Sequence, residues 1–433
     1  MLKRTTIVVA VVGLLSSAAV ASAETLAVKA GRLVDTESGQ VLVGQTILIE
    51  NDRITKVGDS KSMAVPAGAS VIDLTDETVL PGLIDCHTHL LDETESDPIV
   101  ELQKSGAEKA LEAIPHAKRT LAAGFTTVRD VGTFHAFTDV ALRDAIARGE
   151  VVGPRMFVCG AYLTTTGGGG SVTGLATGIE LPKELRFGQA DSPWEARKVV
   201  RELAHHNVDL IKVIATGAVL AHNSNPAGSE FTFEELQAAV DEANRFGLKV
   251  AAHAHGAQGI KDAVRAGVAS IEHGTDLDDE GIALMKKHGT YLVADVYDDE
   301  YIQGDAKLKG MPGDFLKHEA VVAQIQRDNF AKAVKAGVKI AFGTDAGVFP
   351  HGQNARQFAW MVRYGMTPMQ AIQSATINAA DLIGQRAILG SVATGKKADL
   401  VAVKGDPTHN VSQLEHIDFV MKDGAVFRGA GAH

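Results

Sequence analysis

Cysteine is scarce in this chain, with only Cys86 and Cys159 among 433 residues. Two cysteines cannot build a disulfide framework, so a hydrophobic core has to stabilise the fold. Aromatic residues make up 5%, and the 44 glycines follow no collagen-like period. Cations are outnumbered, with 42 Lys and Arg against 53 Asp and Glu, and the net charge is −11. This charge argues against non-specific binding to nucleic acid, and we expect no nucleic-acid partner.

Long hydrophobic runs are absent except at the beginning of the chain. Lys3 and Arg4 precede an apolar run over residues 7–15, and a small-residue cleavage pattern follows at 21–23. This order is typical of a secretory signal peptide, so we predict a signal peptide over residues 1–23 and export to the periplasm or out of the cell. The run is shorter than the ~20 residues of a spanning helix. We therefore expect no stable membrane span after cleavage.

The two ends of the mature chain have the same strand-like pattern. Residues 24–80 contain short apolar runs separated by turn signals at 51–52 and 58–59, and residues 395–433 contain similar runs with turns at 405–407 and 422–424. We predict one small β-sandwich domain formed from residues 24–80 and 395–433.

The middle of the chain, residues 81–394, alternates short buried strands with helices. Helix starts are clear at Ser192 and Thr232, each followed three residues later by a glutamate. The eight expected strands are Leu83–His87, Thr126–Val131, Arg155–Cys159, Leu210–Ile214, Val250–His253, Ser270–His273, Tyr291–Ala294 and Lys339–Gly343. Their number and spacing predict an α/β fold, a (β/α)₈ TIM barrel. The alternative, a doubly wound open sheet, lacks a GxGxxG motif after a strand.

Residues able to bind metal stand at the carboxyl ends of these expected strands, where barrel enzymes have their active sites. They are His87, His89, Lys212, His253, His255, His273 and Asp345. Residues two apart on a strand face the same side, so His87 and His89 can bind one ion together. A single histidine at a strand end is more often a core residue, and Asp345 alone can be a helix cap. Their occurrence at one end of one barrel predicts a metal site.

The segment Pro81-Gly82-Leu83-Ile84-Asp85-Cys86-His87-Thr88-His89 resembles the amidohydrolase superfamily. The resemblance covers essentially the whole mature chain and includes the motifs Ile-Lys-Val at 211–213, His-Ala-His-Gly at 253–256, Ile-Glu-His-Gly at 271–274 and Gly-Thr-Asp at 343–345. Within the superfamily the chain most resembles the imidazolonepropionase-like group of Xaa-Pro, Xaa-Arg and Xaa-Lys dipeptidases, or carboxypeptidases. It is also similar to ochratoxin-type amidohydrolases.

The resemblance implies a binuclear centre with two Zn²⁺ per subunit. His87, His89 and Asp345 would hold one ion, and His253 and His273 the other. Lys212, carboxylated on its side-chain nitrogen, would bridge both ions. This modification turns a costly buried cation into an anionic oxygen ligand.

The resemblance also implies the reaction, which is hydrolysis of a small peptide or another amide. A metal-bridging hydroxide would attack the scissile carbonyl, because bound metal lowers the pKa of water. Asp345 would be the general base and pass the proton to the leaving amine. His255 would contact the tetrahedral oxyanion or the terminal carboxylate of the substrate.

Substrate contacts are expected in the loops over the barrel mouth. Asp295 lies just beyond the seventh strand with Tyr297, and in the branch of the family that releases C-terminal arginine or lysine an aspartate is similarly placed. A carboxylate pairs well with a guanidinium, so we expect Arg or Lys to be favoured. Gly168, in a glycine-rich loop after the third strand, and His351 are the other expected contacts. Many relatives have a histidine where Gly169 stands.

Two stretches are expected to be loops over this mouth, residues 164–189 and residues 298–314. Other functions stay open. They are an Xaa-Pro dipeptidase, a hydrolase of a non-peptide amide such as ochratoxin, a single-metal cyclic-amide hydrolase that does not need Lys212 as a bridge, and a non-catalytic exported scaffold that binds metal. By resemblance we also expect a homo-oligomer.

Overall fold

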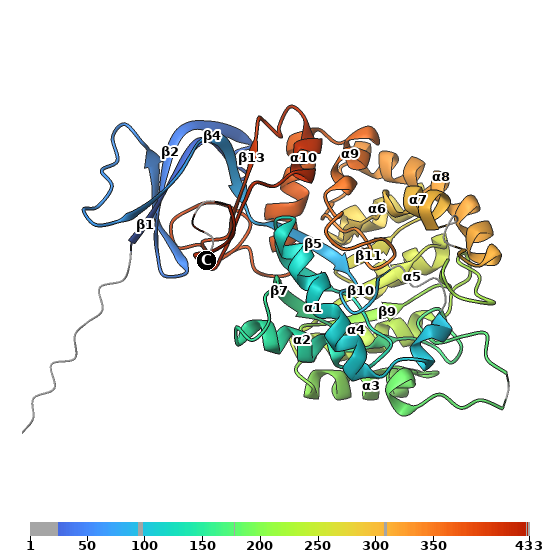
Figure 1. The fold of residues 1–433 in the computed structure, drawn as a ribbon. Helices are drawn as coiled ribbons and strands as arrows, with labels where there is room; N and C mark the ends of the chain where they lie inside the picture. The colour runs from blue at the N-terminus through green and yellow to red at the C-terminus, as the bar shows by residue number, and fades with distance from the viewer. Residues whose placement is uncertain (1–24, 94–97, 177, 307–309, 430, 432–433) are drawn as a thin grey trace, which may run out of the picture.

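The computed structural model describes residues 25–93, 98–176, 178–306, 310–429 and 431 (Figure 1). The predicted signal peptide, residues 1–23, lies outside these residues. None of the helices in the described ranges is long and apolar enough to cross a membrane.

One unit of the molecule is a β-sheet built from both ends of the chain, beside the larger helical unit in Figure 1. Its strands are β1 (Thr25–Asp35), β2 (Gln40–Glu50), β3 (Arg53–Asp59), β4 (Ser70–Pro81), β13 (Leu400–Lys404), β14 (Phe419–Lys422) and β15 (Ala425–Arg428). They form one continuous sheet in the order β15-β14-β13-β4-β1-β2-β3. Because β13 pairs with β4, the two ends of the chain share one core, in which Val28 and Ile47 pack with Leu400 and Phe419. The extra β domain predicted from both ends is thus confirmed.

The larger unit is the predicted (β/α)₈ barrel. Its strands are β5 (Leu83–Thr88), β6 (Phe125–Asp130), β7 (Arg155–Val158), β8 (Tyr162–Leu163), β9 (Leu210–Ile214), β10 (Lys249–Ala254), β11 (Ser270–His273) and β12 (Tyr291–Val293). They pair in parallel as β5-β6-β7 and as β12-β11-β10-β9-β8. A hydrogen bond joins the two groups of strands, because Asp209 N, directly before β9, donates to Val158 O of β7 at 2.8 Å. Seven of the eight predicted barrel strands therefore appear as regular strands.

The eighth predicted strand, Lys339–Gly343, closes the barrel without regular strand geometry. Leu292 N donates to Lys339 O and Cys86 N donates to Phe342 O, each at 2.8 Å. The segment thus lies between β12 and β5. Gly343 permits this close approach, because a Cβ there would lie 2.9 Å from the Cβ of His87 and 2.2 Å from a methyl of Val293.

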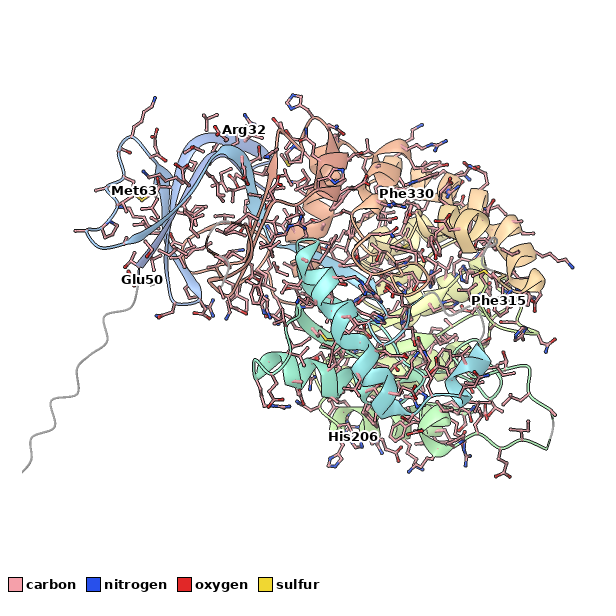
Figure 2. The ribbon with its side chains drawn as sticks, in the orientation of Figure 1. Arg32, Glu50, Met63, His206, Phe315 and Phe330 are labelled. Carbon is pink, nitrogen blue, oxygen red and sulfur yellow. The ribbon has the colours of Figure 1, made fainter. Side chains whose placement is uncertain are left out.

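Helices surround the barrel (Figure 2). They are α1 (Gly106–Ala122), α2 (Thr138–Ala147), α3 (Pro193–His205), α4 (Phe233–Arg245), α5 (Ala257–Ala266), α6 (Asp279–His288), α7 (Asp298–Tyr301), α8 (Gly313–Ala336), α9 (Arg356–Arg363), α10 (Pro368–Gln373) and α11 (Ala379–Leu382). Among them, α7 lies at the mouth of the barrel. The predicted starts at Ser192 and Thr232 are correct, since each side chain accepts a hydrogen bond from the backbone N–H three residues on.

The stretch 298–314 was expected to be a loop, and that expectation is wrong for its first part. Helix α7 begins at Asp298 and continues as a π-helical turn over Ile302–Ala306. Asp298, Asp299 and Glu300 occupy the first turn, where acidic side chains interact favourably with the helix dipole. The turn brings two of these acids to the mouth of the barrel. In the other expected loop, the described residues of 164–189 contain a short 3₁₀ turn at Lys183–Arg186 and an isolated β-bridge between Thr164 and Gln189.

Candidate metal centre and active site

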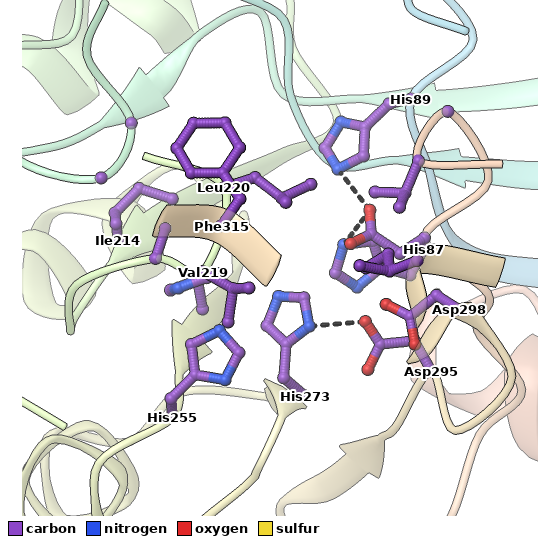
Figure 3. A pocket seen from close by; sticks show the side chains of 18 of the residues that line it. His87, His89, Ile214, Val219, Leu220, His255, His273, Asp295, Asp298 and Phe315 are labelled. Atoms are coloured by element: carbon purple, nitrogen blue, oxygen red, sulfur yellow. Dashed lines mark hydrogen bonds and ion pairs between the residues drawn. The ribbon is translucent and has the colours of Figure 1, made fainter. Parts of the chain in front are cut away.

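A cavity opens at the carboxyl ends of the barrel strands, and most of the predicted site residues line it (Figure 3). They are His87, His89, Lys212, His253, His255, His273, Asp295 and Asp345. These side chains converge because neighbouring strands run parallel and end on the same side of the barrel. In the register of β10 with its neighbours, Ala251 lies opposite Lys212 of β9 and Ala254 lies opposite His273 of β11.

One group of possible metal ligands is His87, His273 and Asp345, whose donor atoms all lie within 4.8 Å of one another. His89 joins it, because its Nε2 lies 3.1 Å from Asp345 Oδ1 and His87 Nε2 lies 3.4 Å from the same oxygen. Burial would raise the pKa of Asp345, but the two facing imidazoles hold this pKa well below its usual range. An ionised carboxylate beside two imidazoles is a suitable ligand set for a divalent cation.

A second group is His253, His255 and His273, again within 4.8 Å. The rings of His253 and His273 have centroids 4.5 Å apart. Burial and the neighbouring His273 lower the pKa of His255 to about 3, so this imidazole is neutral. His255 is expected to contact the substrate, and in the structure it also lies in one group with the possible metal ligands His253 and His273.

The histidines pass a test for metal binding that depends on their tautomers. In each, one ring nitrogen faces an oxygen that accepts hydrogen bonds. The pairs are His87 Nδ1 with Glu272 at 3.0 Å, His89 Nδ1 with Gly132 O at 2.9 Å, His273 Nδ1 with Asp295 at 2.6 Å and His253 Nε2 with Gly217 O at 3.1 Å. That nitrogen must carry the proton, so the other nitrogen keeps its lone pair for a metal. The residues present therefore fit a metal centre.

Lys212 lies on β9 within this ring of histidines and is 2% exposed. Burial lowers the pKa of its ammonium group, which disfavours the charged form. A neutral amine is the form that reacts with carbon dioxide, as the carboxylated lysine implied by the family resemblance would require. Such a group would replace a costly buried cation by oxygen ligands.

Backbone strain is concentrated at two of these residues. His273 has φ 64° and Asp345 has φ 56°, which is the left-handed region that side chains other than glycine rarely adopt. His273 is the last residue of β11, Asp345 comes two residues after the closing segment 339–343, and both line the cavity. Such strain persists when the surrounding structure imposes it, and it is common in active sites.

A buried ion pair supports the centre from behind. Glu272 is fully buried, and its two oxygens accept from His87 Nδ1 and, at 2.8 Å, from Arg129 Nη2. Arg129 and His87 hold the pKa of Glu272 well below its usual range against the effect of burial. Neither Glu272 nor Arg129 is among the residues given a role from the sequence. The sequence feature that could have identified them is a charged residue inside a strand that is buried throughout, Arg129 in β6 and Glu272 in β11.

Asp295 lies at the cavity, but both of its oxygens are already in use. Oδ2 accepts from His273 Nδ1 and Oδ1 accepts from Gln326 Nε2, each at 2.6 Å. Figure 3 shows the contact between Asp295 and His273 as a dashed line. Asp295 thus orients a possible metal ligand, instead of presenting a free carboxylate to the substrate.

Three other predicted substrate contacts are not among the described residues that line the cavity. The hydroxyl of Tyr297 accepts from Arg356, and its ring packs on Phe349. His351 stacks on His116 at a centroid distance of 4.9 Å. Gly168 lies behind its neighbours Gly169 and Gly170, which do line the cavity.

Helices α7 and α8 form one wall of the cavity, and this wall was not predicted from the sequence. Asp298, Asp299 and Glu319 line the cavity there, with Phe315 and Val322. On α8, Phe315, Glu319, Val322 and Gln326 follow the spacing i, i+4, i+7, i+11 of one helix face. In Figure 3, Val219, Leu220 and Phe315 lie on the opposite side of the view from Asp295 and Asp298.

Comparisons with known proteins agree with this site. The family model of the amidohydrolase family matches residues 78–427. A solved structure of an Xaa-Pro dipeptidase with bound methionine is 40% identical, with a TM-score of 0.89, over 94% of this chain and 100% of that one. Ochratoxinase from Aspergillus niger is 32% identical over 372 residues, which are 82% of this chain and 76% of the relative. A prolidase complexed with N-methylphosphonate-L-proline is 30% identical, with a TM-score of 0.85, over 94% of this chain and all of that chain.

The family match covers the barrel and the C-terminal strands of the β-domain, and the strand-end histidines, Lys212 and Asp345 all lie within it. This chain therefore belongs to the amidohydrolase family and is a metal-dependent enzyme that hydrolyses amide bonds.

Proposed function

We propose that this enzyme is a dipeptidase or carboxypeptidase that releases the C-terminal amino acid of a short peptide and favours arginine or lysine. The observation that carries the proposal is the position of Asp345, whose ionised carboxylate faces His87 and His89 at the floor of an open cavity. The preference for a basic residue is supported by the acidic wall of the same cavity.

Two metal ions would be held by His87, His89 and Asp345 and by His253 and His273, with carboxylated Lys212 between them. Bound there, the ions would lower the pKa of a water molecule and polarise the amide carbonyl. Asp345 would accept the proton of the attacking water and transfer it to the leaving amine. His255 would contact the negatively charged oxygen that develops on the carbonyl, or the terminal carboxylate, through the ring nitrogen that does not face Thr275.

The experiment is a dipeptide library assayed with purified metal-loaded protein, with release of free amino acid as the readout. Asp345→Asn is the control, and we expect it to lose at least about 10²-fold in rate with the fold intact. Release of C-terminal arginine or lysine by the wild type alone supports the proposal. Absence of release from every peptide refutes it.

An Xaa-Pro dipeptidase is the second candidate, and the observation that favours it is the 40% identity to an enzyme of that name over 94% of this chain. Preferential release of proline in the same library would select it. The similarity to ochratoxinase favours a third substrate class, a non-peptide amide such as ochratoxin.

We also propose that the chain is exported and forms a homo-oligomer. The first part rests on the signal-like residues 1–23 and is tested by N-terminal sequencing of protein recovered from the periplasm or medium. The second rests on the family resemblance and is tested by light scattering.

A further inference from the structure

The carboxyl groups on α7 and α8 outnumber the cations that pair with them. Asp298, Asp299 and Glu319 are 8%, 1% and 2% exposed and all line the cavity. Among the described residues, the cation that pairs with this group is Arg327, through Asp299 at 3.2 Å. Arg327 also lies over the ring of Trp360, 4.3 Å from its centroid. Three buried carboxyl groups beside one guanidinium are electrostatically unfavourable unless protons or another cation join them.

Glu319 lines the cavity beside the carboxyl group of Asp299, with which it interacts, and one of its oxygens lacks a hydrogen-bond donor. The side chain is nearly fully buried, it lines the cavity, and its Oε1 has no hydrogen-bond partner. The pKa of Glu319 is raised, mainly by burial. Burial and the charge of Glu319 likewise raise the pKa of Asp299 well above its usual value. An unsatisfied buried carboxyl oxygen costs free energy, which a bound cation would recover.

The walls next to these acids are apolar. Phe315 and Val322 flank Glu319 on the same face of α8, and Ile302, which directly follows α7, also lines the cavity. A long aliphatic side chain with a cation at its end has the matching chemistry, because its methylene groups pack on apolar surface while its charged end reaches carboxylates. A compact hydrated metal ion would gain no favourable contact with these apolar walls.

We propose that Asp298, Asp299 and Glu319 form a subsite for the guanidinium or ammonium end of the leaving amino acid, and that Glu319 rather than Asp295 determines the preference for it. The assignment deepens the proposed function and rests on it for the identity of the substrate. Asp295 already orients His273, and each of its two oxygens accepts a hydrogen bond, from His273 and from Gln326.

The first test compares two substrates that differ in one charge. Ala-Lys and Ala-norleucine carry side chains of similar length, with and without the ammonium group. In Glu319→Gln, kcat/KM for Ala-Lys should fall about 10- to 100-fold more than kcat/KM for Ala-norleucine, the range expected for a lost charged hydrogen bond. Asp328→Asn is the matched control, because it removes one charge from an exposed position of α8 and should leave the ratio unchanged. An equal fall for both substrates, or an unchanged ratio, overturns the subsite.

The second test measures binding without turnover and separates the subsite from the reaction. Metal-loaded wild type should bind n-butylguanidinium at least about tenfold more tightly than n-butylurea, its neutral counterpart, and Glu319→Gln should abolish the difference. If no peptide is cleaved but this difference holds, the proposed reaction fails and the subsite stands. If peptides are cleaved without any such difference, the reaction stands and the subsite fails. A third equivalent of metal per chain that Glu319→Gln removes would also overturn the proposal, since the subsite would then hold a metal ion.

Discussion

Asp295 Oδ2 and His273 Nδ1 lie 2.6 Å apart, and this contact fixes which nitrogen of His273 can bind a metal. The carboxylate accepts a hydrogen bond from Nδ1, so Nε2 keeps its lone pair, and the ring of His253 lies 4.5 Å away between centroids. His273 adopts a left-handed backbone conformation at the end of β11. The orientation of its ring is therefore set by this backbone conformation and by the hydrogen bond to Asp295.

The first prediction concerns this pair. Asp295→Asn should weaken metal binding about 10- to 100-fold, the usual effect of losing a partner of a metal-bound histidine, because an amide does not hold the imidazole as a carboxylate does. Activity at limiting metal should fall by the same factor for basic and neutral substrates and recover when metal is added. The measurement is kcat/KM against free metal concentration. A loss confined to basic substrates would return Asp295 to the role of substrate selector.

The second prediction concerns the buried pair of Glu272 and Arg129. Glu272→Gln leaves the Arg129 guanidinium buried at 4% exposure without its anionic partner, and breaking such a pair typically costs about 3–5 kcal/mol. The free energy of unfolding from denaturant titration should fall by that order, and metal content should fall with it because His87 loses its anionic acceptor. Glu150→Gln removes an exposed pair with Arg148 and should change neither quantity. Unchanged stability of Glu272→Gln would contradict this account.

The strand-end residues were predictable, whereas the acidic wall was not. In a parallel barrel the carboxyl ends of all strands meet on one side, so histidines placed there by sequence had to converge. Glu319 lies on α8, five residues after the expected loop 298–314, and its role depends on which face of that helix covers the cavity. The same uncertainty misplaced Tyr297: a position just after a strand does not fix the direction of a side chain, and Arg356 binds this hydroxyl away from the cavity. Asp295 was placed correctly, but its partner Gln326 lies 31 residues further on in a helix.

The third prediction concerns the bridging role of Lys212. Lys212→Ala should lower the metal content measured by mass spectrometry of the elements from two ions per chain, because the two histidine groups would lose their common ligand. Bicarbonate labelled with ¹³C should give a carbamate signal in the NMR spectrum of the wild type and none in the variant. Lys249→Ala is the control, since Lys249 lies at the beginning of the adjacent strand β10 and donates to backbone carbonyls of Asp381 and Leu382. Metal content that does not change in Lys212→Ala would favour the single-metal cyclic-amide hydrolase instead.

The fourth prediction is a pH dependence of stability that arises at the glycine-rich loop. Both oxygens of Glu230 accept from Gly169 N, at 2.8 and 3.1 Å, and burial raises the pKa of this carboxyl to about 7. Between the unfolded pKa near 4.5 and the folded value, the folded state binds the extra proton, so the contribution of Glu230 to stability is present at low pH and is lost as the pH rises to 7. The loss is on the order of 3 kcal/mol for a shift of this size. In Glu230→Gln, the fall in unfolding free energy between pH 5 and pH 8 should therefore be smaller than in the wild type by that order. Equal slopes in the two proteins would mean that Glu230 keeps an ordinary pKa and that the loop is held in the same way at both pH values.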